Sequence, residues 1–68
     1  MATESSIGEN IKKHRSKTGL SQEDFAQKSG VKYTTLTKIE SGVIKTPSVV
    51  IMAKIAKALD VSIEELIK

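Results

Sequence analysis

Apolar residues recur along the chain at intervals of three and four, and no segment alternates regularly between apolar and polar residues. Intervals of three and four place side chains on one face of a helix, whereas alternation is typical of a half-buried strand. The pattern predicts an all-α fold with five helices, at residues 7–18, 21–29, 32–41, 47–59 and 62–67. The predicted core comprises Ile7, Ile11, Leu20, Phe25, Ala26, Val31, Leu36, Ile39, Met52, Ile55, Leu59, Ile63, Leu66 and Ile67.

Short polar motifs mark where these helices begin and end. A serine followed three residues later by an acid occurs at Ser6 and Glu9, at Ser21 and Asp24, and at Ser62 and Glu65. Such a serine accepts a hydrogen bond from a free amide of the first turn, and the acid complements the helix dipole. Glycine, which readily adopts the left-handed conformation that ends many helices, follows each of the first three.

The connections between the predicted helices are short, and no linker rich in serine, glycine or proline divides the chain. A chain of 68 residues supports one domain. We therefore assign residues 7–68 to a single domain and residues 1–6 to a flexible tail without an apolar anchor.

The predicted helix 32–41 has one apolar face, formed by Leu36 and Ile39, and one polar face. The polar face comprises Tyr33, Thr34, Thr37 and Lys38. Threonine loses more rotamer freedom in a helix than Glu or Lys, so this composition indicates a contact surface. The alternatives are a solvated face, or a tyrosine that packs on helix 21–29. A short turn containing glycine joins these two helices, as in a helix-turn-helix.

The distribution of charge narrows the class of partner. The chain carries 11 Lys and Arg against eight Asp and Glu, and a net charge of +3. The whole excess lies in residues 1–45, which hold eight basic and five acidic residues, whereas residues 46–68 hold three of each. A one-sided basic balance favours an anionic partner such as nucleic acid.

Other functional classes lack the residues that they need. There is no cysteine, and His14 is the only histidine, so we expect no disulfide, metal site or cofactor. The chain also lacks a partner for that histidine and a glycine loop for phosphate, and the neighbours Glu64 and Glu65 are its only paired carboxylates on one helix face, so we expect no enzyme. No apolar run approaches the roughly 20 residues that span a bilayer, and we expect a soluble, cytoplasmic protein that is not in a membrane.

The string LSQEDFAQKSGVKYTTLTKIESG, residues 20–42, resembles the helix-turn-helix of the lambda-repressor and Cro-type regulators, the xenobiotic-response-element family. The string TPSVVIMAKIAKALDVSIEELI resembles the fourth and fifth helices of that family. The resemblance implies a five-helix, lambda-repressor-like DNA-binding domain whose helix 32–41 lies in the major groove.

The resemblance also implies roles for individual positions. The residues at base-contacting positions are Tyr33, Thr34, Thr37 and Lys38, and those at phosphate-contacting positions are Gln22, Lys32, Ser41 and Lys45. Gln22 is further implied to brace the start of the recognition helix. Arg15 and Glu40 correspond to a partly buried ion pair, and Ile44, Val50, Val61 and Ile63 are the candidates for a dimer interface. Lys32 departs from the family pattern, because it stands where a serine or threonine usually caps the recognition helix. Asp60 also departs from it, because it stands where glycine usually closes the fourth helix, so the resemblance implies a left-handed aspartate at some energetic cost.

These observations predict a transcriptional regulator that binds double-stranded DNA sequence-specifically, a repressor rather than an activator, as a homodimer on a palindromic operator. By resemblance, it would be a bacterial or phage protein associated with the nucleoid, without a small-molecule ligand. The alternative class is an antitoxin or a protein-interaction module that uses the same fold. The sequence does not identify the operator, the effector or the source organism. It also leaves open whether the 68 residues are a whole protein or the amino-terminal domain of a longer one.

Overall fold

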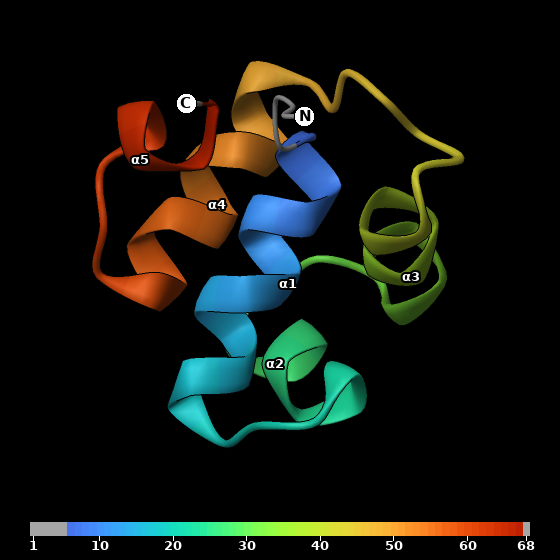
Figure 1. The fold of residues 1–68 in the computed structure, drawn as a ribbon. Helices are drawn as coiled ribbons and strands as arrows, with labels where there is room; N and C mark the ends of the chain where they lie inside the picture. Colours follow the sequence, from blue (N-terminus) through green and yellow to red (C-terminus); the bar gives the residue numbers. More distant parts are fainter. Residues whose placement is uncertain (1–5, 68) are drawn as a thin grey trace.

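The computed structural model describes residues 6–67, which form five α-helices and no strand. The helices are α1 (Ile7–Thr18), α2 (Gln22–Ser29), α3 (Tyr33–Ser41), α4 (Val49–Leu59) and α5 (Ile63–Ile67) (Figure 1). The predicted all-α fold is confirmed, with boundaries that differ by at most two residues. Residues 1–5, which make up most of the predicted tail, and Lys68 lie outside the described residues.

Serine side chains cap four of the five helices. The hydroxyl oxygens of Ser6, Ser21 and Ser62 accept hydrogen bonds from the amides three residues on, at 3.1, 3.1 and 3.3 Å. Ser6 therefore caps α1, as its spacing from Glu9 predicts. Ser48 caps α4 by accepting from the Ile51 amide at 3.2 Å, and this cap moves the start of α4 two residues past the predicted one.

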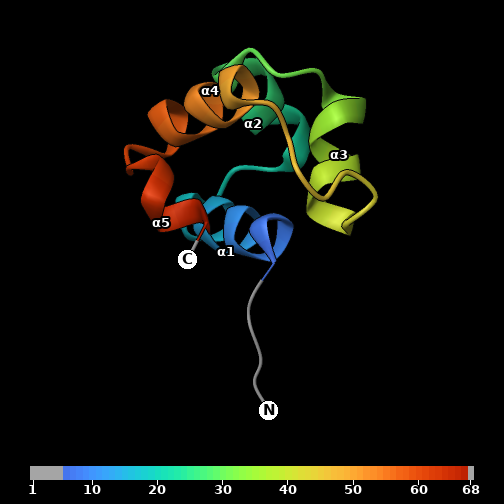
Figure 2. The ribbon, with the colours of Figure 1, turned by 90° about the horizontal axis from the view of Figure 1, so that it is seen from above.

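The core lies where all five helices meet. Its fully buried side chains are Ile11, Phe25, Leu36, Ile39, Ile55 and Leu66. Helix α1 packs against α3, α4 and α5, and α2 packs against α3 and α4. Figure 2 shows α1 opposite α2 and α4, with α3 and α5 on either side. Every helix thus contributes at least one side chain to the interior, so that the position of α3 depends on its neighbours.

Helix α5 departs from the predicted core. Ile63 and Ile67 are 36% and 54% exposed, so the prediction that they face inward was wrong. The helix has only five residues, and within it only Leu66 is buried. Asn10, a buried residue of α1, donates from Nδ2 to the Leu66 carbonyl at 2.8 Å. This hydrogen bond fastens α5 to α1 where the short helix offers little apolar contact.

Asp60 ends α4 in the left-handed conformation, with φ 60° and ψ 42°, as the sequence predicts. The conformation costs a residue with a Cβ about 1 kcal/mol, and a negative charge at a helix C-terminus opposes the helix dipole. Replacing Asp60 with glycine would remove both costs, but glycine has more conformational freedom in the unfolded chain, which offsets part of the gain in stability. We expect Asp60→Gly to raise the free energy of unfolding by about 0.5 kcal/mol, measured by urea denaturation.

Asp24→Gly provides the control for this substitution. Asp24 lies in the first turn of α2, where its charge complements the dipole and where glycine lowers helix stability. The control should therefore lose stability. If Asp60→Gly lost stability as well, the left-handed conformation would not be a source of strain.

Candidate nucleic-acid interface

Helices α2 and α3 are joined by three residues, Gly30, Val31 and Lys32. Gly30 has φ 80°, and its amide donates to the Ala26 carbonyl at 3.0 Å, which ends α2. Val31 is buried and anchors the turn to the core, and α3 begins two residues later. The sequence thus forms the predicted pair of helices, in which a buried turn holds the second helix at the surface.

The polar face of α3 lies at the surface of the protein. Tyr33 is 48% exposed, Thr34 and Lys38 are exposed, and Thr37 is half-buried. On the opposite face Leu36 and Ile39 are fully buried. The structure therefore brings the four predicted base-contacting residues together on the outward side of one helix.

Two hydroxyl groups on this face donate to the backbone of their own helix. Thr37 Oγ1 donates to the Thr34 carbonyl at 2.9 Å, and Ser41 Oγ donates to the Lys38 carbonyl at 3.2 Å. The proton of each hydroxyl is occupied, whereas the lone pairs of the oxygen can still accept. Thr37 can therefore offer an acceptor and a methyl group to a partner, while Lys38 supplies a charged donor.

The other predicted phosphate-contacting residues lie at the two ends of α3. Lys32 is exposed and makes no side-chain cap, so the first amides of α3 have no side-chain partner, as its place in the sequence predicts. Lys32 also lines a shallow hollow between the turn and α4, together with Lys54, which the sequence did not single out. Ser41 is exposed at the other end of α3, and Lys45 is exposed in the loop that follows it. Positive charge thus lies on both sides of the polar face.

Gln22 makes a different contact from the expected one. Its Nε2 donates to Glu40 Oε1 at 2.9 Å, at the last turn of α3. The expectation that Gln22 braces the start of α3 was therefore wrong, because the two helices cross so that the first turn of α2 lies beside the end of α3. Gln22 is half-buried, and its predicted contact with a phosphate stays a prediction.

The carboxylate of Glu40 is the centre of a polar network between three elements. Arg15 donates to it twice, from Nε to Oε2 at 2.7 Å and from Nη2 to Oε1 at 3.1 Å. Nη1 of the same arginine donates to the Leu20 carbonyl at 2.7 Å. The side chains of Arg15 and Glu40 are only 12% and 2% exposed, so this bidentate pair joins α1 to α3 largely away from solvent.

The four candidates for a dimer interface do not share one environment. Val50 is 64% exposed and Ile63 lies at the surface, whereas Ile44 and Val61 pack partly against the core. Val43 and Val49 are also exposed, and neither is among the candidates. The apolar surface therefore comprises the loop after α3, the start of α4 and α5.

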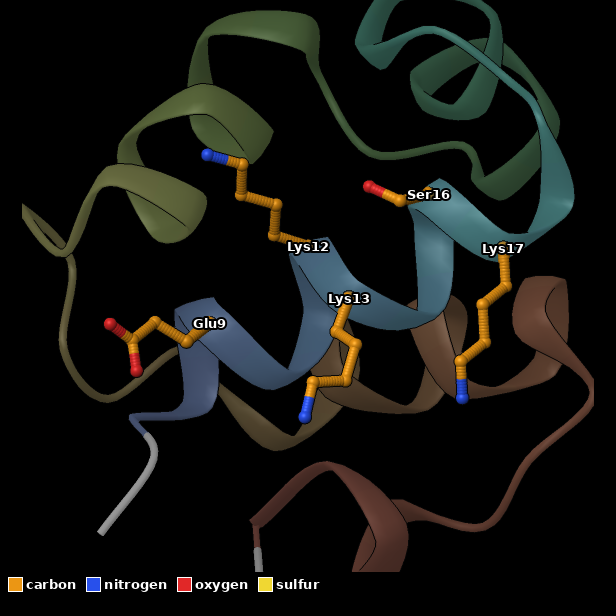
Figure 3. A pocket seen from close by; sticks show the side chains of 5 residues that line it. All are labelled: Glu9, Lys12, Lys13, Ser16 and Lys17. Atoms are coloured by element: carbon orange, nitrogen blue, oxygen red, sulfur yellow. The ribbon is translucent and has the colours of Figure 1, made fainter. Parts of the chain in front are cut away.

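A row of charged side chains follows the solvent side of α1. Lys12, Lys13 and Lys17 line a shallow hollow with Glu9 and Ser16. Lys12 extends toward α3, whereas Lys13 and Lys17 point away from it (Figure 3). All five residues come from a single helix, so no second element closes the hollow around a ligand. The described residues also hold no cluster of His, Asp and Glu that could bind a metal ion, and no helix among them could cross a bilayer.

Comparison with known proteins extends the interpretation of this surface. A helix-turn-helix family model matches residues 11–66. Over 61 residues, the chain is 36% identical to the HTH-type transcriptional regulator SinR of Bacillus subtilis. The alignment covers 90% of this chain and 55% of SinR, so the chain spans about half the length of this relative.

Solved structures with the same fold include a crystal structure of SinR in complex with DNA. It matches with a TM-score of 0.86 and 37% identity, over 88% of this chain and 95% of the crystallised chain. The restriction-modification controller protein C.AhdI of Aeromonas hydrophila matches with a TM-score of 0.82 and 35% identity, over 88% and 89% of the two chains. The similarity covers the helix-turn-helix and the helices that support it.

Proposed function

The chain belongs to the helix-turn-helix family of Cro type, and on this premise we propose that it binds double-stranded DNA and regulates transcription. In this proposal α3 lies in the major groove, which is wide enough to admit a helix. SinR, whose domain shares the fold at 37% identity, is a transcriptional regulator that has been crystallised with DNA. No reaction is part of the proposed function.

The observation that carries the proposal is the arrangement of the outward face of α3. Lys38 supplies a cationic donor for guanine O6 or N7, Thr37 an acceptor and a methyl group, and Tyr33 a ring with a hydroxyl group. Lysines beyond both ends of the helix would bind phosphates and fix its register on the duplex. A solvated face without a partner would not account for exposed threonine and tyrosine between two basic ends.

The finer proposal is a cytoplasmic repressor that acts as a homodimer on a palindromic operator. Val50 and Ile63 are apolar and exposed, and a two-fold contact through them would bury apolar surface that is otherwise exposed to solvent. A pair of recognition helices related by two-fold symmetry reads half-sites about 34 Å apart. We propose that residues 6–67 are the unit that makes each half of this contact.

Selection of bound duplexes from a random pool tests the proposal, with the winning duplex titrated at several salt concentrations. If the selected duplex is palindromic and the affinity for it falls steeply as the salt concentration rises, the protein binds as a dimer that contacts DNA phosphates. A selected duplex with a single half-site would contradict the proposed homodimer but would agree with the proposed DNA binding. Equal affinity for all duplexes would contradict sequence-specific regulation and favour a protein-interaction module or antitoxin.

A further inference from the structure

Gly8 lies in the first turn of α1, and its backbone closely approaches the backbone of the recognition helix, α3. A Cβ atom placed on Gly8 would overlap the carbonyl oxygen of Ile39. The same atom would lie 3.1 Å from the Ile39 carbonyl carbon and 3.3 Å from the Glu40 carbonyl oxygen. All three are backbone atoms of α3, so no side chain can turn aside to make room for a methyl group.

The contact falls where α3 ends. The Ile39 carbonyl accepts a hydrogen bond from the amide of Gly42, the left-handed residue that closes the helix. Its position is therefore tied to the last turn of α3 and to the loop that carries Lys45. Any change in the distance between Gly8 and Ile39 would move the end of the recognition helix and this loop together.

A second contact holds the same turn of α3. Arg15 follows Gly8 by seven residues, which is about two helical turns, and so lies on the same side of α1. Glu40 is held at both points, because its carbonyl lies beside Gly8 and its carboxylate accepts from Arg15. Ile11, fully buried, lies between them along the helix. Helix α1 thus fixes both the distance and the rotation of α3.

We propose that Gly8 is a positioning residue for sequence recognition: the absence of a side chain sets how closely α3 approaches α1, and hence how its polar face meets the base edges. This inference rests on the proposed function. Hydrogen bonds to base edges tolerate only a few tenths of an ångström, whereas long lysine side chains can follow a phosphate. A displaced α3 would therefore lose base recognition before it lost general affinity for DNA.

The test is Gly8→Ala, with the duplex selected by the wild-type protein and a scrambled duplex of the same length as probes. In an ordinary helix interior this substitution raises stability, because alanine is the better helix former. Here we expect a lower unfolding temperature and a loss of roughly tenfold or more in the ratio of specific to scrambled affinity. Ser16→Ala, on the exposed side of the same helix, should leave this ratio unchanged.

The ratio separates positioning from stability, because a smaller folded fraction lowers both affinities by the same factor. To keep the variant folded, we would measure it at low temperature and also together with Asp60→Gly, a change far along the chain from α3. An unchanged ratio would overturn the proposal, as would a variant that stays unfolded in both settings, since Gly8 would then serve folding alone. A wild-type protein without preference for any duplex would refute the proposed function itself.

Discussion

Replacing Glu40 with glutamine is expected to lower the free energy of unfolding by about 3 kcal/mol. Three donors converge on the carboxylate, two from Arg15 and one from Gln22. An amide offers one acceptor oxygen, so in either orientation at least one of these donors would face an NH₂ group. The arginine would also keep its charge at a site where it is only 12% exposed, without a counter-charge.

Thermal unfolding followed by circular dichroism measures this effect. In a domain of this size 1 kcal/mol corresponds to about 4–8 °C, so the midpoint should fall by more than about 10 °C. Glu23→Gln, at an exposed position in the first turn of α2, is the matched control and should cost at most about 0.5 kcal/mol. Equal midpoints for the two variants would show that the ion pair does not hold α3 to α1.

Helix boundaries were predictable where the signal is local. Ser6, Ser21 and Ser62 each have an acid three residues later, and each caps a helix. Ser48 was not predicted as a cap because Ile51 follows it at that spacing, although the hydrogen bond needs only the serine oxygen and the backbone amide. In this chain each serine followed three residues later by an acid caps a helix, and Ser48 shows that a cap does not need the acid.

Burial was less predictable in short elements. Periodicity assigns apolar residues to the faces of a helix but does not say how much of each face a neighbour covers. Helix α5 has three apolar residues among five, and only Leu66 reaches the core, which leaves Ile63 and Ile67 exposed. The same limit applies to Ile44 and Val61, two candidates for a dimer interface that pack partly against the core.

Contacts between residues distant in sequence depend on how the helices cross, which no local pattern encodes. Gln22 was expected beside the start of α3 and instead donates to Glu40 near its end. Gly8 has an ordinary helical neighbourhood in the sequence, and its contact with Ile39 appears only when α1 and α3 are placed in space. The one available signal was its spacing of three from Ile11 and seven from Arg15, which marks the side of α1 that meets α3.

The polar face of α3 leads to the second large effect, on recognition and not on folding. We expect Lys38→Ala to make the free energy of binding to the selected duplex less favourable by about 1–3 kcal/mol and to relax the base preference at one position. Lys38 is exposed, and alanine is a good helix former, so the unfolding temperature should change little. Affinities for duplexes that carry each of the four base pairs at that position measure the effect.

Lys45→Ala is the matched control, since it removes the same charge from an exposed position in the loop after α3. A lysine on a phosphate carries no sequence information, so this variant should weaken binding to every duplex alike. It should also reduce the slope of log affinity against log salt by about one. If Lys38→Ala behaved in the same way and kept the base preference, the Lys38 amine of the wild-type protein would contact a DNA phosphate and not a base. Base recognition would then rest on Tyr33, Thr34 and Thr37 alone.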